Sequence, residues 1–342
     1  MCTKLILCVD SGSTKTICAI ANEKGKVLGL GSAGPSSHYA VSVEKAKENF
    51  RVAIRKAVAS AGLNNVVFDV GCFGMTALDT KSDHELISSF ITSLNIAKKC
   101  VIVIDATIAH YAVTNGEPGI VVIAGTGSIA YGVNERGEVA QSGGREWLVS
   151  DEGSAYDIAK KGLTAVIRAY DGRGTDTLLV EMFKKHFGVS TFEGILQKIY
   201  EDTGKSTIAT LAPIITSAAQ RGDAVALNIL KKAGRELGLA TFAVAKRLNM
   251  EKERITVGCI GGVFKAGKFI LKPFKKTVKT HIPKAIFKPP IYDAIMGAII
   301  LGLKKGGVHI TRELIRKIKY DLKLKSSLGI SGGNIFNQLT NK

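Results

Sequence analysis

Short apolar runs and amphipathic stretches alternate along the first third of the chain. The apolar runs at 5–9 and 17–21 flank a turn rich in glycine and serine, which indicates a strand, a tight turn and a returning strand. Residues 43–61 have apolar positions at helical spacing, begin after the N-cap candidate Ser42 and stop at Gly62. These patterns predict one mixed α/β unit. Its other expected elements are a third strand ending at 34–35, strands over 66–73 and 100–104, and helices over 83–94 and 106–114.

The strand, turn and returning strand occur a second time, over 120–133. The hairpin segment that follows each copy is also repeated, because NERGEV at 134–139 shares four of six residues with NEKGKV at 22–27. We interpret this similarity as an internal duplication, which predicts two halves of the same architecture. If the halves face each other, both glycine-rich turns are expected at one cleft.

The rest of the chain has mostly helical periodicity. A buried strand over 254–260 interrupts it and is followed by Gly261 and Gly262, after which a further helix is expected to start at Val263. The polar tail at 323–342 is expected to be poorly ordered. The other expected helices cover 153–170, 177–186, 191–202, 208–220, 223–248 and about 293–304.

Length and composition favour a soluble protein of two domains. A chain of 342 residues exceeds the usual size of a single core, so two domains of ordinary size are expected. Hydrophobic residues make up 46% and charged residues 22%, and no apolar run approaches the ~20 residues that span a bilayer. The apolar core before Asp10 is too short for a signal peptide. We therefore expect a cytoplasmic protein without a membrane partner.

The cysteines and the net charge narrow the possible classes further. The six cysteines are scattered singly without a CxxC pair, which favours reduced thiols packed as small hydrophobes. The net charge of +18 is compatible with nucleic acid or with a phosphorylated or carboxylated small molecule. Residues 265–288 contain eight lysines and no acid but no nucleic-acid motif, so we interpret them as a solvated face or a basic rim beside a nucleotide. No nucleic-acid partner is expected.

Two glycine-rich turns have the composition of phosphate-binding loops. Glycines let backbone N–H groups converge on phosphate oxygens, and neighbouring hydroxyls add donors. The turns DSGSTK at 10–15 and GTGS at 125–128 are of this type, although each alone is also typical of an ordinary hairpin turn. Their duplication, together with a third Gly-Gly turn at 261–262, favours phosphate binding. None of the three turns fits the P-loop or the GxGxxG dinucleotide spacing.

Five motifs, taken in order, resemble those of the actin-like ATPase superfamily of sugar kinases, heat-shock 70 proteins and actin. A further segment, LAPIITSAAQRGD at 211–223, is similar to the one that precedes the nucleotide helix. Within the superfamily the chain looks like the branch of N-acetylglucosamine kinases and BadF/BadG/BcrA/BcrD ATPases. The five motifs are VDSGSTKT at 9–16, VIDATIA at 103–109, VIAGTGS at 122–128, SDEGSAY at 150–156 and VGCIGGVF at 257–264.

The resemblance implies an α/β fold of two duplicated, ribonuclease H-like actin-like domains with a cleft between them. The smaller domain would comprise 1–112 and a returning C-terminal helix within about 294–342. The larger domain would comprise 113–293, with helical insertions and the adenosine motif. The resemblance also implies an ATP- and Mg²⁺-dependent kinase that phosphorylates a hydroxyl of a small sugar or sugar derivative. Relatives are often dimers, so a homodimer is expected.

The implied ATP site uses both glycine turns. Phosphoryl transfer to a hydroxyl needs a carboxylate base, and Asp105, at the end of a strand, resembles that base. Asp105 would also serve well as the N-cap of the helix over 106–114. Asp10 resembles the residue that holds Mg²⁺ through water. The implied phosphate ligands are Gly12, Ser13, Thr14, Lys15, Gly125, Thr126 and Gly127, and the implied adenosine ligands are Gly261, Gly262 and Val263.

The implied sugar site departs from the family pattern. Asp151 resembles the ligand of sugar hydroxyls, with capping of the next helix as its alternative role. The family commonly has an Asn where this chain has Ser37, and Gly-Gly-Trp-Gly where Gly144 is followed here by Arg145. An arginine fork suits a carboxylate or phosphate, so Arg145 indicates an acidic sugar. The candidate substrate ligands are Ser37, His38, Thr126, Gly144, Arg145 and Asp151.

Several alternatives stay open at this point. Arg145 has Glu146 and Glu152 as alternative surface ion-pair partners, and Trp147 suits either a sugar platform or the core. Under the kinase hypothesis, amino sugars and neutral hexoses compete with acids such as 2-keto-3-deoxygluconate. A dehydratase-activator ATPase would hold an iron–sulfur cluster through paired cysteines, whereas no two cysteines here lie closer than six residues apart. A non-catalytic sugar sensor would keep the fold without turnover.

Overall fold

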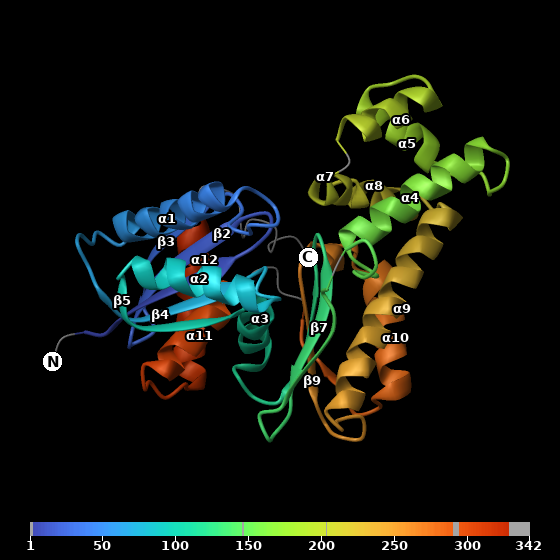
Figure 1. Cartoon of the computed structure of the whole chain (residues 1–342). Helices are drawn as coiled ribbons and strands as arrows, with labels where there is room; N and C mark the ends of the chain where they lie inside the picture. Colours follow the sequence, from blue (N-terminus) through green and yellow to red (C-terminus); the bar gives the residue numbers. More distant parts are fainter. Residues whose placement is uncertain (1–2, 146, 203, 290–293, 328–342) are drawn as a thin grey trace. The chain divides into compact units, whose positions relative to one another are not determined.

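The chain forms two compact units in the computed structural model, each built on one five-stranded mixed sheet (Figure 1). Glu146 and the part of the expected tail beyond 327 lie outside the described residues. The described residues are 3–145, 147–202, 204–289 and 294–327. The first unit comprises 1–117 with 293–342, and the second comprises 118–292.

The first unit has five strands and helices from both ends of the chain. The strands are β1 Leu5–Ser11, β2 Thr16–Asn22, β3 Val27–Ala33, β4 Phe68–Met75 and β5 Ala97–Ile104. The helices are α1 Val43–Ser60, α2 Lys81–Ser93, α3 Asp105–Thr114, α11 Ile295–Lys305 and α12 Arg312–Ser327. In the sheet order β3-β2-β1-β4-β5, the first three strands are antiparallel and β1, β4 and β5 are parallel. The carboxyl ends of these parallel strands therefore lie at one edge of the sheet.

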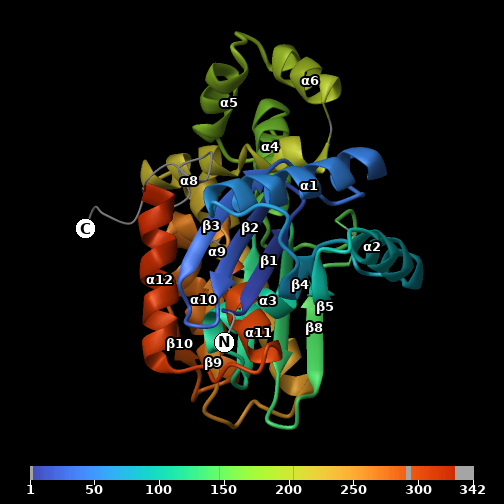
Figure 2. The same ribbon diagram turned by 90° about the vertical axis from the view of Figure 1, so that its left-hand side faces the viewer.

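Alternate residues of β1 face two different layers of helices. Leu7 lies in one core with Phe50 of α1 and Ile91 of α2. Ile6 faces α11, where a Cβ on Gly302 would lie 2.7 Å from its side chain. This alternation is the ordinary geometry of a strand that is buried on both faces. The helix α12 packs along β3, as Figure 2 shows.

Most of the cysteines described in the structure lie in the cores of the two units. Cys8, Cys18, Cys72 and Cys259 are buried, and burial raises the pKa of each of these thiols. A thiol that stays protonated in an apolar core packs as a small hydrophobe. Cys100 is exposed.

The second unit repeats the topology of the first. Its strands are β6 Gly119–Ala124, β7 Ser128–Val133, β8 Val139–Gly143, β9 Thr256–Ile260 and β10 Ile286–Phe287. Its helices are α4 Ala155–Tyr170, α5 Leu179–Phe187, α6 Phe192–Glu201, α7 Lys205–Ala209, α8 Ala212–Gln220, α9 Ala224–Arg247, the 3₁₀ helix η1 Gly262–Ala266 and α10 Lys268–His281. The order across the sheet is β10-β9-β6-β7-β8. As in the first unit, the first three strands along the chain, β6, β7 and β8, are antiparallel, and the last two, β9 and β10, are parallel to β6. The repeated topology confirms the internal duplication.

The repeated hairpin segments also share their hydrogen bonds. In each copy the first Asn accepts, at its Oδ1, the backbone N–H groups two and four residues later. Asn22 accepts them from Lys24 and Lys26 at 3.1 and 3.0 Å, and Asn134 accepts the equivalent pair at the same two distances. The glycine of each copy has a left-handed φ, +72° in the first and +77° in the second. The identical residues are therefore the ones that make the turn.

The lysine-rich segment forms the surface helix α10, which lies beside α9 (Figure 1). Ile270, Phe274 and Val278 recur every four residues and are buried. Gly234 of α9 lets the two helices approach, because a Cβ there would lie 2.5 Å from the carbonyl oxygen of Ile270. The lysines of α10 are exposed, which agrees with the expected solvated face.

The structure differs from the sequence expectations in three elements. Residues 208–220, expected as one helix, lie across α7 and α8, and Pro213 in the first turn of α8 favours a new helix start there. The short strand β10 was not expected, and α12 continues to residue 327, inside the segment expected to be a disordered tail. Of the helices in the described ranges, none combines the length and apolar character that crossing a membrane requires.

Candidate active site

The first glycine turn is anchored by buried hydroxyl groups. It follows β1, and the Gly12 N–H donates to the carbonyl oxygen of Lys15 at 2.9 Å. Ser36 donates its own N–H to the carbonyl oxygen of Gly12 at 3.3 Å. The Ser36 hydroxyl also lies 2.7 Å from the Ser11 hydroxyl and accepts from the Thr16 hydroxyl at 2.7 Å. Between these anchors Ser13 is half-buried, while Thr14 and Lys15 are exposed at the tip of the turn.

Asp105 is the first residue of α3 and not its N-cap. The N-cap position belongs to Ile104, and within the described residues no side chain makes a capping hydrogen bond there. The Asp105 carboxylate instead accepts hydrogen bonds from the Thr76 hydroxyl and the Ala106 N–H. Thr76 follows β4, so two neighbouring strands hold this carboxylate at their carboxyl ends.

Burial and like charges make Asp105 a weaker acid than an ordinary carboxyl. Burial is the largest cause and the charges of Asp10 and Asp79 add to it, so that the pKa of Asp105 rises to about 7 despite its two hydrogen bonds. A carboxylate with a pKa near neutrality accepts a proton at physiological pH more readily than an ordinary one. The general-base role of Asp105 therefore stays a prediction that this raised pKa favours.

Asp10 lies where a divalent cation would relieve this crowding of carboxylates. It pairs in register with Gly74 of β4, which pairs with Val103 of β5, two residues before Asp105. Both carboxylates thus come from the same edge of the sheet. Within the described ranges, no group of three or more His, Cys, Asp or Glu side chains is arranged to hold a metal ion by itself. Mg²⁺ that keeps its waters and binds phosphate oxygens needs only one or two protein carboxylates, so Asp10 fits such an ion.

The second glycine turn lies directly against Asp151. The Asp151 carboxylate accepts the Ser128 N–H at 3.0 Å through Oδ1, and its Oδ2 lies 2.7 Å from Nζ of Lys205. A Cβ on Gly127 would lie 2.7 Å from Oδ2 of Asp151. Asp151 is 3% exposed and has a left-handed φ of +67°. The phosphate motif and the acidic turn therefore form one cluster within the second unit.

Helix α4 is capped by Ser154, so that Asp151 is not needed as a cap. The Ser154 hydroxyl accepts the Asp157 N–H, while Asp151 contributes only its backbone carbonyl, which accepts the Ser154 N–H at 3.0 Å. The next N–H groups of α4 donate to the glycine turn: Ala155 to the Gly125 carbonyl at 2.8 Å and Tyr156 to the Thr126 carbonyl at 3.4 Å. These bonds fix the orientation of the turn.

The third glycine turn approaches the second one through the backbone. Gly261 has φ +113°, and a Cβ there would lie 2.4 Å from the carbonyl oxygen of Ala124. A Cβ on Gly262 or Gly125 would meet no described heavy atom within 4 Å. This open space beside two backbone segments suits a flat ring and its phosphates. The Val263 side chain is buried, so a nucleotide contact there would come from its backbone.

The sugar-ligand candidates of the first unit take part in local structure. Ser37 is 1% exposed, and its carbonyl accepts the N–H of Ala40 at 3.0 Å. The His38 ring bonds Oδ1 of Asp83 through Nε2 at 2.9 Å, and the Tyr39 hydroxyl donates to the same oxygen at 3.0 Å. Burial would raise the pKa of Asp83, but the hydrogen bonds from Thr80, His38 and Tyr39 hold it well below its usual range. His38 is thus oriented by the start of α2.

The segment after β8 presents Arg145 to solvent. Gly144 has φ +66°, and a Cβ there would lie 2.8 Å from the Ile129 side chain. Arg145 is exposed, and among the described residues no ion pair joins it to Glu152; the other expected partner, Glu146, is not described. Trp147 packs edge-on against Tyr156 with ring centroids 4.8 Å apart, which indicates a packing role at the start of α4.

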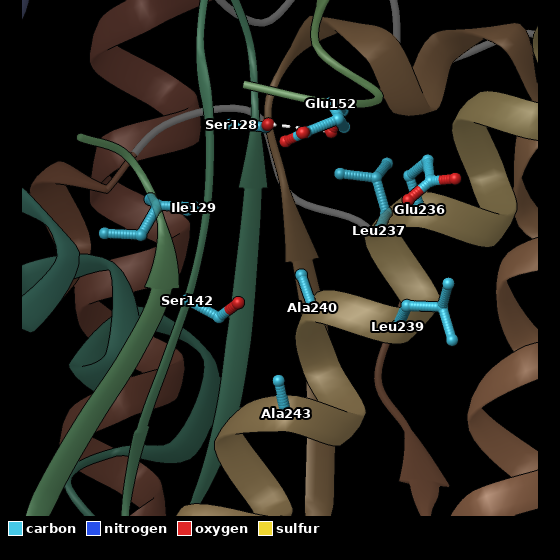
Figure 3. Close-up of a pocket in the computed structure, with 10 residues that line it drawn as sticks. Ser128, Ile129, Ser142, Glu152, Glu236, Leu237, Leu239, Ala240 and Ala243 are labelled. Carbon is cyan, nitrogen blue, oxygen red and sulfur yellow. Dashed lines mark hydrogen bonds between the residues drawn. The ribbon is translucent and has the colours of Figure 1, made fainter. Parts of the chain in front are cut away.

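Two features of the second unit carried no signal in the sequence. Lys205 lies outside every motif and reaches Asp151 across more than fifty residues. The second feature is a pocket of about 270 Å³ between β7, β8 and α9 (Figure 3). Glu152 and Glu236 are among the residues that line it. Ser128 lines the pocket, and its hydroxyl donates to the Glu152 carbonyl at 2.9 Å. The other lining residues include Ile129, Ser142, Leu237, Leu239, Ala240 and Ala243.

Similarity to known proteins agrees with this arrangement. A curated relative is the N-acetylmuramic acid/N-acetylglucosamine kinase of Clostridium acetobutylicum, 32% identical over 299 residues that cover 87% of this chain and 98% of the relative. The N-acetyl-D-glucosamine kinase of Dictyostelium discoideum is 29% identical over 89% of this chain and 99% of its own. A Chromobacterium violaceum structure, provisionally named an N-acetylglucosamine kinase, has a TM-score of 0.72 at 22% identity and covers 88% of this chain and 99% of its own.

The solved structure supports the fold, and the expected fold class is confirmed. The motif order, the duplicated sheets and the sequence match lead to one conclusion. The BadF/BadG/BcrA/BcrD ATPase family model matches residues 7–302, so the chain belongs to that family.

Proposed function

We propose that the protein is an ATP- and Mg²⁺-dependent kinase that phosphorylates a hydroxyl of an N-acetylated amino sugar. The observation that carries this proposal is Asp105, a carboxylate with a pKa of about 7 beside Asp10. A hydrolase of ATP alone needs no protein base matched to a sugar hydroxyl, whereas a sugar kinase does. The names of two curated relatives support an N-acetylated amino sugar as the acceptor.

In this proposal the first unit supplies the base and the metal ligand. Bound MgATP supplies the phosphoryl group and offsets the negative charge that develops during its transfer. Asp105 accepts the proton of the attacking sugar hydroxyl while Thr76 and Ala106 hold its carboxylate in place. Asp10 would hold the magnesium ion, and the backbone N–H groups of residues 12–15 would bind phosphate oxygens.

The second unit would bind the sugar and the rest of the nucleotide. An ionised carboxylate has about four acceptor sites, and Asp151 uses one for the Ser128 N–H and another for Lys205. The remaining sites would accept hydrogen bonds from sugar hydroxyls. Thr126 and Gly127 lie beside it and would bind phosphate, and Gly261 with Gly262 would let adenosine approach the backbone.

Arg145 favours an acceptor that includes an acid group. It is exposed, and a guanidinium fork suits the two oxygens of a carboxylate. The Clostridium relative is named for a sugar acid as well as for a neutral sugar. We therefore include N-acetylmuramic acid with N-acetylglucosamine among the proposed acceptors, ahead of 2-keto-3-deoxygluconate.

The decisive experiment measures ADP formation with MgATP and a panel of sugars. The panel contains N-acetylglucosamine, N-acetylmuramic acid, glucosamine, glucose and 2-keto-3-deoxygluconate. We expect ADP formation with the two N-acetylated sugars. In Arg145→Ala, we expect activity with N-acetylmuramic acid to be lost selectively. Equal loss of both sugars in that variant would remove the case for an acid-binding arginine. Glu48→Gln, on the exposed face of α1, is a matched control outside the site.

Two other functions give different results in the same experiment. A non-catalytic sensor would bind sugars in calorimetry but form no ADP with any of them. A dehydratase-activator ATPase would hydrolyse ATP without a sugar and would be brown after anaerobic purification. Four of the described cysteines are buried, which leaves them poorly placed to hold an exposed cluster.

A further inference from the structure

Lys205 makes an ion pair with the proposed sugar ligand from a part of the chain that has no motif. Its Nζ lies 2.7 Å from Oδ2 of Asp151. The Asp151 side chain is 4% exposed and that of Lys205 is 29% exposed. A carboxylate enclosed to this degree needs compensation of its charge, and within the described residues this lysine is the cation paired with it.

The position of Lys205 is held by its own helix start. Lys205 is the first residue of α7, and Asp202 makes hydrogen bonds to residues on both sides of Lys205. Asp202 accepts the Gly204 N–H at 3.0 Å and the Thr207 hydroxyl at 2.8 Å through its two carboxylate oxygens. Helix α7 packs against α4, the helix that begins directly after the acidic turn. The start of α7 that carries the ammonium is thus held by local hydrogen bonds and by packing against α4.

The lysine also limits how the Asp151 carboxylate can move. The Ser128 N–H holds Oδ1 from one side, and Lys205 holds Oδ2 from the other. Gly127 lies beneath the pair, since a Cβ there would be 2.7 Å from Oδ2 and 3.1 Å from the lysine Nζ. Two separate segments, the second glycine turn and the start of α7, therefore define the orientation of this carboxylate.

We propose that Lys205 is a positioning residue for sugar binding, which acts by holding the Asp151 carboxylate in the correct orientation. This inference rests on the proposed kinase function. It ties the helical segment of α5, α6 and α7 to the sugar site, because the residue that orients Asp151 belongs to that segment. Acting through Asp151, Lys205 affects affinity for every sugar that Asp151 binds, whether neutral or acidic.

The test is a double-mutant cycle on Lys205 and Asp151. The variants are Lys205→Met, Asp151→Asn and the double variant, with kcat and KM measured for N-acetylglucosamine, N-acetylmuramic acid and MgATP. We expect Lys205→Met to raise KM for both sugars at least about tenfold, with kcat and the KM for MgATP nearly unchanged. The double variant should be no worse than Asp151→Asn, because the lysine has nothing left to position.

Two further variants separate positioning from loss of folding. Lys205→Arg keeps the cation and should restore most of the sugar affinity. Lys198→Met removes another lysine of the same helical segment, one that pairs with Glu201 on the surface, and should behave as wild type. Thermal unfolding of all variants identifies any that fail to fold.

Several outcomes would overturn the inference. Additive losses in the double variant would show that Lys205 acts independently of Asp151. If Lys205→Met raised KM for N-acetylmuramic acid alone, Lys205 would be a ligand of the acid group of the sugar. If only kcat or the KM for MgATP changed, Lys205 would be a phosphate ligand. If wild type phosphorylates no sugar, the proposed function fails first. If wild type is active and Lys205→Met equals it, this inference alone fails.

Discussion

The two sheets share one topology but place their carboxylates in opposite electrostatic surroundings. At the edge of the first sheet, Asp105 has the charges of Asp10 and Asp79 as neighbours, and its pKa rises to about 7. At the equivalent edge of the second sheet, Asp151 has an ammonium group 2.7 Å away. Duplication supplied the same scaffold twice, and a few side chains gave the carboxylates of the two edges different neighbours.

This difference suggests different tasks for the two edges. A crowded pair of carboxylates attracts protons and divalent cations, since either relieves the repulsion. A carboxylate that is paired with an ammonium group still has acceptor sites for neutral hydroxyls. In the proposed function the first edge performs the chemistry and the second holds the substrate. Each of the following predictions changes one side of this contrast.

The largest effect is expected when the base is removed. Asp105→Asn keeps the shape of the side chain but cannot accept the hydroxyl proton, so kcat should fall by about 10² to 10⁴. The KM of the sugar should change little, because Asp151 is untouched. Steady-state kinetics check both values. A kcat within threefold of wild type would show that Asp105 is not the base.

A large effect is also expected from pH. Asp105 must be ionised to act, and its pKa is raised to about 7, so kcat/KM for the sugar should fall about tenfold per unit as the pH drops below 7. Mg²⁺ at Asp10 would remove part of the repulsion, so saturating MgATP should move the inflection to lower pH. The residual activity of Asp105→Asn should lack the inflection. An inflection that persists in that variant would belong to another group.

The same shift predicts a change in stability of known sign. A carboxyl with a raised pKa binds a proton more tightly in the folded state, so wild type should lose stability as the pH rises from about 4 to 7. Asp105→Asn lacks this loss and should become relatively more stable over that range. Urea unfolding at several pH values measures the difference.

Moderate changes in KM, which differ between the two positions, are expected from substitutions at Gly125 and Gly127 of the second turn. Gly127→Ala places a Cβ 2.7 Å from the Asp151 carboxylate and should raise KM for the sugar about tenfold, in addition to raising KM for MgATP through the phosphate contact of this turn. Gly125→Ala meets no described atom within 4 Å, so its methyl group should instead obstruct the phosphates and raise KM for MgATP. Measuring both KM values for both variants tests this pairing. If the two variants show the same pattern, Asp151 is not the sugar ligand.

The smallest effects concern the duplicated hairpins. Asn22→Ala and Asn134→Ala each remove two hydrogen bonds to backbone N–H groups and should each cost about 1–2 kcal/mol of unfolding free energy. Asn134 is 6% exposed and also donates to Glu138, so its loss should be the larger one. Kinetic constants should stay near wild type. Urea unfolding gives the free energies.

Local signals in the sequence predicted much of the fold. The cap at Ser42, the glycine turns and the repeated NE-G-V hairpin depend on residues within a few positions, and the structure contains each of them. The helix α12 was not predicted because its side chains are mostly polar, with Ile318 and Leu322 among its few buried residues. The helix expected to start at Val263 is present as the 3₁₀ helix η1 followed by α10.

The candidate site was predicted only as far as its motifs extend. Asp105, Asp10 and Asp151 each lie in a recognisable segment, but the raised pKa of Asp105 depends on neighbours from other strands. Lys205 could not be found from the sequence, because its contact with Asp151 joins distant segments and a lone lysine has no spacing signal. Long-range charge pairing is thus the part of the site that only three-dimensional structure supplied.

The left-handed backbone of Asp151 has a consequence for anyone who redesigns substrate choice at this site. At φ +67° the position accepts glycine, asparagine or aspartate readily, whereas a branched or bulky side chain would strain the chain. In a saturation library at position 151, backbone strain would therefore destabilise most variants, whatever the effect of the new side chain on the substrate. Changes of specificity are easier to obtain at the neighbours of this residue than at the residue itself.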